Sequence, residues 1–513
     1  MTNKSFFTDF EESLFFKRLW SFIVQNQKTK IKGLLGSSLS FYCSSIIKKS
    51  VKPSIFIFNN KEESLYFLND LETINPEKHI FYLPEISKEP YSNKAPNNYN
   101  LLQRTEVVEH LNFSKNKNSV IVTHVNAIAT NQINKNEIKK NSITLKLNQN
   151  ISFDKLNEKL FELNFRREDF VVEPGEFAVR GGILDIFPYS SQTPYRIEFF
   201  GDEITRIRSF DIESQRSDQS HSSVKIISNI QVSNESKNIQ NIFEILFNET
   251  IIFSQCLKSF NLQLERIIDL AKANHKKCLN RHEFVSPDNL YVNLDMVNNK
   301  LQNFKIIEFN SISSKVDFKI NIQPQPSFNK SFNLLFENIL KKKTEGYKVN
   351  LCCTNNQQKN RLRQIFEDLD NDGIIEPVIL PLSAGFIDLD QKIIYYTDHQ
   401  IFERYHKFKF RKRFNNKLSV ALKQLNNLSK GDYVTHIDHG IGKFGGLQQI
   451  EIDGKLQESI KIIYGERDVL FLSVHAIHKI SKYNGKEGKV PRLYKLGSKA
   501  WALLKQKTKK NVK

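Results

Sequence analysis

The stretch EPGEFAVRGGILDIFP, residues 173–188, predicts two short β-strands held between turns. A proline and a glycine near its start favour a tight turn. Phe177–Arg180 and Ile183–Phe187 have the composition of strands, and the glycine pair between them lets the backbone bend or bulge. Pro188 ends the second strand, because it cannot donate a hydrogen bond to a neighbouring strand.

Two more strands are expected over Tyr195–Phe200 and Glu203–Phe210, joined by a Gly-Asp turn. Polar and apolar residues alternate along both, which is typical of an antiparallel sheet with one buried face. A helix over residues 153–164 precedes them. We therefore predict a β-rich module over residues 140–225. Taken alone, the same pattern is that of a β-meander without a binding role.

The whole chain is too long for one hydrophobic core. With 513 residues, about three to five domains are expected. The chain has 75 Lys and Arg against 56 Asp and Glu, a net charge of +19. This excess favours a polyanionic partner. A chain rich in Lys, Asn, Ile and Phe is also typical of an AT-rich genome, so both causes stay open.

The sequence gives no sign of export, metal binding or membrane insertion. Five cysteines without framework spacing favour a reducing cytoplasm. His275, Cys278 and His282 lie close together, but zinc needs a fourth ligand and none is near, so no metal is expected. No apolar run reaches the roughly 18 residues of a membrane span.

Residues 1–135 alternate helices with buried strands and predict a mainly parallel α/β sheet, completed by residues 226–325. The turn KGLLGSSLS lies where a nucleotide-binding fold carries its phosphate loop. It contains Gly33, Gly36 and Ser37 but no lysine that could neutralise phosphates. We expect a nucleotide-binding type of fold that does not bind ATP.

Residues 326–415 predict a small α/β domain. In it, Asp398, His399 and Glu403 suggest a catalytic cluster, although a strand end leading into a basic segment is the favoured interpretation.

Residues 428–483 predict a small antiparallel barrel, followed by a basic helix over residues 490–513. Its His436 and His439 lie in a glycine-rich turn without cysteines, which favours structural histidines over metal ligands.

Two of these blocks resemble one protein family. Residues 173–217 resemble the second domain of the excision-repair protein UvrB and, more closely, the UvrB-like module of the transcription-repair coupling factors (Mfd). GDYVTHIDHGIGKFGGL, residues 431–447, is similar to that family's RNA-polymerase-interacting domain, which resembles CarD-type regulators. Residues 478–508 look like its connector helix, and the turn at 33–40 looks like its degenerate nucleotide-binding domain. The two blocks together are specific, because UvrB lacks the second and CarD lacks the first.

The resemblance implies that the β-rich module binds UvrA through arginines beside an exposed phenylalanine. The matching residues are Arg167, Phe177 and Arg180. Arginine suits an acidic partner, because its planar head donates bidentate hydrogen bonds. Ala178 stands where UvrB has an arginine. On the residues alone, the alternative is that Phe177 faces the core and Arg180 pairs with Glu176 or Asp185.

The resemblance also implies that the barrel docks on the β subunit of RNA polymerase. The family's contact is an apolar residue on an edge strand, matched here by Ile450, with Gln449 and Glu451 beside it. Pairing of this edge with a polymerase strand would supply backbone hydrogen bonds. The alternative is that Ile450 points inward, since alternation places it on the same face as Ile452.

In the family, an ATP- and magnesium-dependent DNA translocase motor follows this segment. No motif of that motor occurs in the 513 residues, so we expect no catalytic residue and no cofactor. The resemblance implies a monomeric, cytoplasmic adaptor for UvrA and polymerase that also binds DNA weakly, through basic residues near 405–417 and 499–513.

Two alternatives stay open. One is a UvrB-like ATP-dependent repair helicase, which the missing lysine disfavours. The other is a polymerase-binding regulator of CarD type, which would not bind UvrA.

Overall fold

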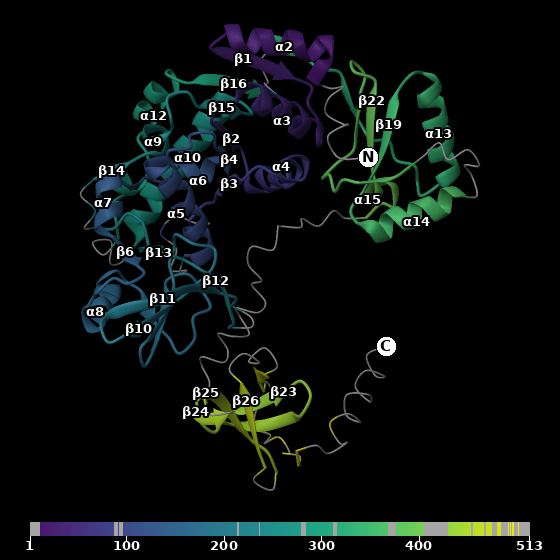
Figure 1. Ribbon diagram of the computed structural model, residues 1–513. Coiled ribbons are helices and arrows are strands. Elements are labelled where there is room, and N and C mark those ends of the chain that lie inside the picture. Colours follow the sequence, from purple (N-terminus) through teal and green to yellow (C-terminus); the bar gives the residue numbers. More distant parts are fainter. Residues whose placement is uncertain are drawn as a thin grey trace. The chain divides into compact units, whose positions relative to one another are not determined.

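The computed structural model describes most of the chain, namely residues 11–86, 91, 96–212, 215–234, 236, 238–278, 284–310, 315–367, 376–404, 429–452, 455–465, 468–473, 480–483, 491, 493, 495–496 and 501. The chain divides into two compact units. Their helices and strands are labelled in Figure 1. The first comprises residues 1–137 and 230–411, and the second comprises residues 138–229 and 412–513.

The first unit is built on a seven-stranded sheet in which every described pairing is parallel. In spatial order its strands are β17 (Phe318–Lys319), β1 (Lys28–Lys32), β16 (Lys305–Phe309), β15 (Ile251–Ser254), β2 (Ser54–Phe58), β4 (Val120–His124) and β3 (Ile80–Leu83). The central strands β2, β4 and β15 are buried along their whole length. This burial is typical of a parallel sheet with helices on both faces, so the expected parallel sheet is confirmed.

Alternate residues of β2 enter two separate cores. Phe56 and Phe58 pack with α2 (Leu14–Gln25), α3 (Ser38–Ser50) and α4 (Lys61–Ile74). Ile55 and Ile57 pack on the other face. The helices of that face are α5 (Asn98–Phe113), α6 (Val125–Ile128), α9 (Ile242–Ile245), α10 (Leu257–Lys277), α11 (Pro287–Leu290) and α12 (Leu294–Leu301). The segments 1–135 and 226–325 thus build one sheet from both sides of the inserted module.

Three short elements complete this part of the chain. β5 (Gln132–Ile133) pairs with β14 (Ile239–Gln240) in an antiparallel manner, and α7 (Lys135–Lys140) follows β5.

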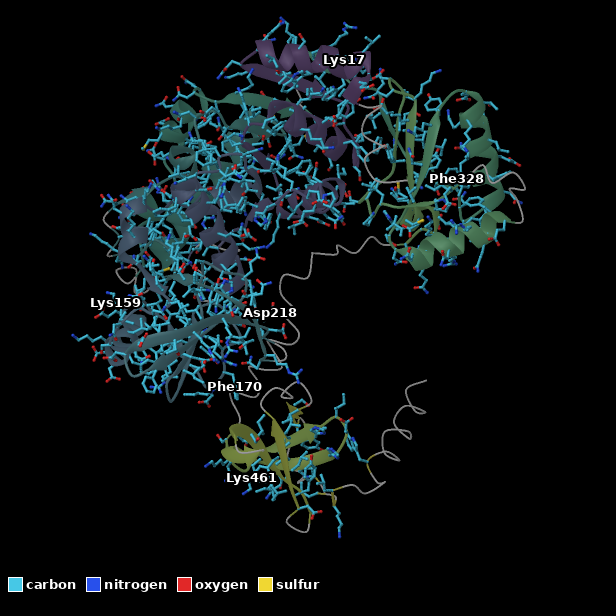
Figure 2. All side chains as sticks on the ribbon, viewed as in Figure 1. Lys17, Lys159, Phe170, Asp218, Phe328 and Lys461 are labelled. Carbon is cyan, nitrogen blue, oxygen red and sulfur yellow. The ribbon has the colours of Figure 1, made fainter. Side chains whose placement is uncertain are left out.

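A second, five-stranded sheet belongs to the same unit. Its order is β18 (Ile322–Pro324), β21 (Phe386–Asp388), β22 (Ile393–Thr397), β19 (Lys348–Cys353) and β20 (Val378–Ile379). Its helices are α13 (Phe332–Thr344), α14 (Asn356–Glu367) and α15 (Asp398–Ile401). Phe328, labelled in Figure 2, lies in the core of this small α/β domain, 5.4 Å from the ring of Tyr396 between centroids.

Helix α3 lies between the two sheets. It is buried from Ser38 to Ile47, because the seven-stranded sheet covers one side and the five-stranded sheet covers the other. The ring of Phe41 lies 5.4 Å from that of Phe386 and 4.4 Å from that of Tyr395. Four buried serines on the helix allow its neighbours to approach closely.

The second unit contains the β-rich module, whose six-stranded sheet has the strand order of a meander. The strands are β12 (Ser217–Ser220), β11 (Glu203–Phe210), β10 (Tyr195–Phe200), β9 (Ile183–Phe187), β8 (Glu176–Arg180) and β7 (Arg166–Arg167). α8 (Phe153–Glu162) covers one face, and β6 (Ser142–Lys146) pairs with β13 (Ser223–Ile227). The four strands predicted from the sequence are confirmed.

The turn that opens this module depends on Gly175. Its φ is +89°, and a Cβ there would lie 2.3 Å from the hydroxyl of Tyr189. Glycine is therefore required both for the backbone conformation and for the close approach of the tyrosine.

A second antiparallel sheet in this unit contains β26 (Val469–Ser473), β25 (Lys455–Ile463), β24 (Gly440–Ile452), β23 (Tyr433–His436) and β27 (Ile480–Lys482), in that order. Closure of this sheet into a barrel stays a prediction. Of the basic helix expected over residues 490–513, most lies outside the described residues.

Among the described residues, no helix has the length and apolarity needed to span a bilayer.

Candidate functional site

One face of the six-stranded sheet is strongly charged. α8 covers the face that carries Phe177, Leu184 and Ile197. The strand register places the arginines on the opposite face, because side chains alternate between the faces of a strand. We call this the arginine face; its described members are Arg166, Arg180, Arg196, Arg206 and Arg208, with Glu176, Asp185 and Glu198 among them.

Each of these three carboxylates is paired. Arg196 donates from Nε to Oδ1 and from Nη2 to Oδ2 of Asp185, both at 2.7 Å. Nη2 of Arg166 lies 3.4 Å from Oε1 of Glu176, and Glu198 pairs with Arg206 and Arg208. Among these named members, arginines outnumber carboxylates by five to three, which suits an acidic partner.

Arg180 lies at the end of β8, and three neighbouring residues contact its guanidinium. Its Nη1 is 3.7 Å from Oδ2 of Asp185, its Nη2 donates to the carbonyl of Asp169, and its guanidinium lies 4.6 Å from the ring centre of Phe170. The pairing with Asp185 considered from the sequence is confirmed. Glu176, the other residue considered, accepts from the backbone N–H groups of Val172 and Glu173 and lies 3.4 Å from Arg166.

The expectation of an exposed Phe177 is wrong. Its side chain is fully buried, and its ring meets the edge of Phe161 at 5.2 Å. Residues three apart in a strand point to opposite faces, so Phe177 and Arg180 do not share a surface. The alternation of EFAVR already carried that signal. Arg167 is exposed on the edge strand β7, as expected for a surface residue.

Four arginines of this face were not singled out from the sequence. Arg196, Arg206 and Arg208 occupy alternate positions of β10 and β11, and Arg166 precedes the predicted Arg167. Their shared face could have been found from the period-two alternation alone.

The predicted polymerase contact lies on a strand with an open edge. β24 is divided by a bulge at Gly445–Gly446, where the register with β25 shifts. Before the bulge, β24 pairs with both β23 and β25; after it, among the described residues, only β25 pairs with Leu447–Ile452.

Ile450 lies in this open half, opposite Gln457, with Gln449 and Glu451 opposite Glu458 and Leu456. The side chains of these three predicted residues lie outside the described part, so the direction of Ile450 stays a prediction. Among the described residues, no second strand pairs with this half of β24, which is the arrangement that strand addition needs.

The histidine turn has a structural arrangement. Nδ1 of the buried His436 accepts hydrogen bonds from the backbone N–H groups of Asp438 at 3.1 Å and His439 at 3.2 Å. These bonds close the turn between β23 and β24, in agreement with a structural role.

The cluster at the end of β22 is also engaged within the fold. Asp398 accepts from the hydroxyl of Thr354 at 3.0 Å and lies 3.5 Å from Arg404. Nε2 of His399 lies 3.1 Å from the carbonyl of Ser383. These contacts favour the strand-end interpretation over a catalytic one.

The expected degenerate phosphate loop precedes α3. Gly33 and Gly36 have positive φ values of +100° and +54°. If Gly33 is the first glycine of a phosphate loop GxxxxGK[ST], Leu39 stands where the lysine would be. Leu39 lines a cavity of about 390 Å³ together with Asp70 and Glu63.

This cavity is unsuited to phosphate. Of the described residues that line it, none is lysine or arginine, so an anion would meet carboxylates without a compensating cation. Burial raises the pKa of Asp70 to about 6, which reflects the cost of placing its charge in this environment.

Comparisons with known proteins identify two regions of the chain. Residues 143–231 match the family model of the UvrB interaction domain, and residues 428–484 match that of the CarD-like/TRCF RID domain. These ranges contain the arginine face and the open half of β24.

The chain is also similar over most of its length to transcription-repair-coupling factors. It is 26% identical to that of Bacillus subtilis, with 98% of this chain and 49% of the relative covered. It is 28% identical to that of Rickettsia bellii (92% and 47% covered) and 25% identical to that of Haemophilus influenzae (85% and 43% covered). The chain thus spans about half the length of the curated relatives it matches.

Proposed function

Since this chain belongs to the family of transcription-repair-coupling factors, we propose that it is an adaptor that binds RNA polymerase and UvrA at two separate surfaces. The observation that carries the proposal is the presence, in one chain, of a UvrB interaction domain with a cationic face and a TRCF-type domain with an open strand edge. An adaptor needs two such surfaces, because each partner must remain bound while the other docks.

The UvrA surface is assigned to the arginine face around Arg180. Its guanidinium is already oriented by Asp185, Asp169 and Phe170, so little side-chain entropy is lost when a partner carboxylate docks. Arg196 lies closer to Asp185 than Arg180 does, at 2.7 Å against 3.7 Å. Arg167 is opposite Phe177 in the register of β7 and β8, so its side chain belongs to the other face of the sheet. It is therefore assigned only to the rim of the contact region, as an exposed residue of the edge strand, whereas buried Phe177 supports the sheet.

The polymerase surface is assigned to the open half of β24, with Ile450 as its apolar anchor and Gln449 and Glu451 beside it. A strand of the polymerase β subunit would add to this edge through backbone hydrogen bonds, and Ile450 would supply specificity.

The remaining parts of the proposal follow from the family. The chain acts as a monomer without a cofactor or catalytic residue, and its DNA contact is weak and non-specific. ATP-driven translocation, which would release stalled polymerase, is assigned to the part of the relatives that this chain does not span.

The test is a bridging experiment with the purified chain, UvrA and RNA polymerase. We expect one ternary complex on size-exclusion chromatography. Arg180→Glu should remove UvrA and keep polymerase, and Ile450→Arg should remove polymerase and keep UvrA. Ile450→Val is the matched control, because it retains a β-branched apolar side chain.

Other outcomes would contradict the proposal. Polymerase binding without UvrA binding by the wild-type chain would favour a regulator of CarD type. ATP hydrolysis by the purified chain would favour a UvrB-like helicase. Retention of polymerase by Ile450→Arg would refute the edge assignment.

A further inference from the structure

The loop before β21, Ser383–Gly385, docks on the degenerate phosphate loop. The backbone N–H of Ser37 donates to the carbonyl of Ala384 at 3.3 Å, and the N–H of Ala384 donates to Oγ of Ser37 at 3.0 Å. The hydroxyls of Ser37 and Ser383 are 3.2 Å apart. Ser383 also donates to buried Asp70, from its N–H at 2.7 Å and from its hydroxyl at 2.6 Å.

One arrangement of protons satisfies the whole network. Ala384 donates to the Ser37 hydroxyl, Ser37 donates to the Ser383 hydroxyl, and Ser383 donates to Asp70. Chains of hydrogen bonds with a charged acceptor at one end strengthen one another in a buried setting. The network joins α3 and α4 to a segment more than 300 residues later, since Ser37 and Ser383 are 346 positions apart.

The docking loop is fixed within its own domain as well. The N–H of Gly385 donates to Oε1 of Gln400 at 2.6 Å, and the carbonyl of Ser383 lies 3.1 Å from Nε2 of His399. A Cβ at Gly385 would lie 2.1 Å from Oε1 of Gln325. Contacts with its own domain therefore fix the conformation of the loop where it packs against α3.

The loop uses the backbone group that a phosphate would use. In a phosphate loop, N–H groups at the start of the following helix point at the anion. Here the N–H of Ser37 points at the carbonyl of Ala384, and a Cβ at Gly36 would lie 3.0 Å from Cβ of Ala384. A protein segment thus stands in contact with the helix start.

A second contact reinforces the first along α3. The hydroxyl of Tyr42 donates to Oδ2 of the buried Asp388 at 2.9 Å and accepts from Nε2 of Gln391 at 3.2 Å. The rings of Phe386 and Tyr395 complete the contact through Phe41.

We propose that the former phosphate-binding position has become a fixed joint, in which Ser383–Gly385 takes the place of a ligand and holds the small α/β domain on the seven-stranded sheet. The joint needs no nucleotide. It keeps these two domains together whether or not ATP is present, so a partner bound on either domain moves with both.

Amide hydrogen exchange of the full chain tests the joint. Asp70→Ala removes the acceptor of both Ser383 bonds, and we expect at least about tenfold faster exchange in the peptide that contains residues 383–388. Glu63→Ala is the matched control, because Glu63 lines the same cavity without an observed bond to the loop. Millimolar ATP should leave the wild-type exchange unchanged.

Unchanged exchange in Asp70→Ala would overturn the joint, as would slower exchange of residues 33–40 and 383–388 of the wild type in ATP. If Asp70→Ala fails to fold, the double variant Ser37→Cys/Ser383→Cys decides the matter. The two Oγ atoms are 3.2 Å apart, so mild oxidation should produce a 37–383 disulfide in most molecules, identified by non-reducing peptide mapping. Absence of that disulfide in the folded variant contradicts a fixed joint.

Discussion

Arg196 donates hydrogen bonds to both carboxylate oxygens of Asp185 at 2.7 Å, whereas Nη1 of Arg180 lies 3.7 Å from the same carboxylate. The two arginines thus have different tasks. Arg196 neutralises a carboxylate that is almost completely buried, and Arg180 lies farther from that carboxylate, against the ring of Phe170. A buried ion pair broken on one side leaves an uncompensated charge, which is strongly destabilising, so we expect loss of Arg196 to destabilise the module more than loss of Arg180.

Charge reversal at Arg180 is therefore expected to weaken UvrA binding without unfolding the module. Like charges brought together at an interface cost several kcal/mol, so we expect the Kd of Arg180→Glu for UvrA to rise by about 100-fold. Biolayer interferometry at fixed ionic strength measures this change. Lys155→Glu is the control, since it changes the net charge equally from exposed α8, which covers the opposite face. An equal loss in both variants would mean that only the overall charge matters.

Phe177 should influence UvrA binding only through stability. Phe177→Ala removes a fully buried ring from the core of the module and should lower the free energy of unfolding by about 3–5 kcal/mol. Phe177→Leu keeps an apolar side chain, so it should fold and bind UvrA with wild-type affinity. Urea unfolding followed by circular dichroism gives the first quantity and interferometry the second. If Phe177→Leu folded but no longer bound UvrA, the result would show that Phe177 contributes directly to UvrA binding.

These residues also show how far local pattern predicts this fold. The apolar run Ser54–Phe58 and the alternation in Tyr195–Phe200 sufficed for a parallel sheet and a meander, because both depend on which faces are buried. The side of the sheet on which Phe177 lies followed from the same alternation. The resemblance to relatives favoured exposure, and the physical pattern was the better guide.

The contact between Asp70 and Ser383 could not have been predicted in this way. The two residues are 313 positions apart, and neither belongs to a periodic pattern. One indirect signal existed: from Ser38 to Ile47, α3 has no charged residue. A helix without a charged face is expected to be largely covered by other segments, although the sequence does not reveal which segments cover it.

Lys305, on strand β16 of the seven-stranded sheet, caps the C-terminal end of helix α2. Nζ of Lys305 donates to the carbonyls of Ile23 at 2.6 Å, Val24 at 3.0 Å and Asn26 at 2.7 Å. These carbonyls at the end of α2 have the partial negative charge of a helix C-terminus. Lys305→Met should destabilise the first unit by about 1–2 kcal/mol.

Thermal unfolding and hydrogen exchange of residues 14–26 measure the effect of Lys305→Met. Lys300→Met is the control for loss of one positive charge, because Lys300 is an exposed residue of α12. Faster exchange confined to α2 is expected only in the Lys305 variant. Equal exchange in both variants would show that the cap adds no stability.

Asp70 should make the first unit less stable as the pH rises. Its folded pKa, raised by burial to about 6 from an ordinary 3.8, means that the folded state holds the proton more tightly than the unfolded state does. The stabilisation that protonated Asp70 gives the folded state is therefore fully present below about pH 4 and is lost as the pH rises through about 6. A pKa shift of about two units corresponds to a change of roughly 3 kcal/mol in the free energy of unfolding.

Asp70→Asn isolates this dependence, because its carbonyl can still accept from the Ser383 N–H while its amide donates to the Ser383 hydroxyl. Urea unfolding of both proteins between pH 4 and 7.5 gives the difference in unfolding free energy, wild type minus variant. We expect this difference to fall by about 2–3 kcal/mol across the range, most steeply near pH 5, between the unfolded and folded pKa values, and to level off above about pH 6. A difference independent of pH would show that Asp70 is ionised at no cost, and that the Ser383 and Ser37 donors replace its lost hydration completely.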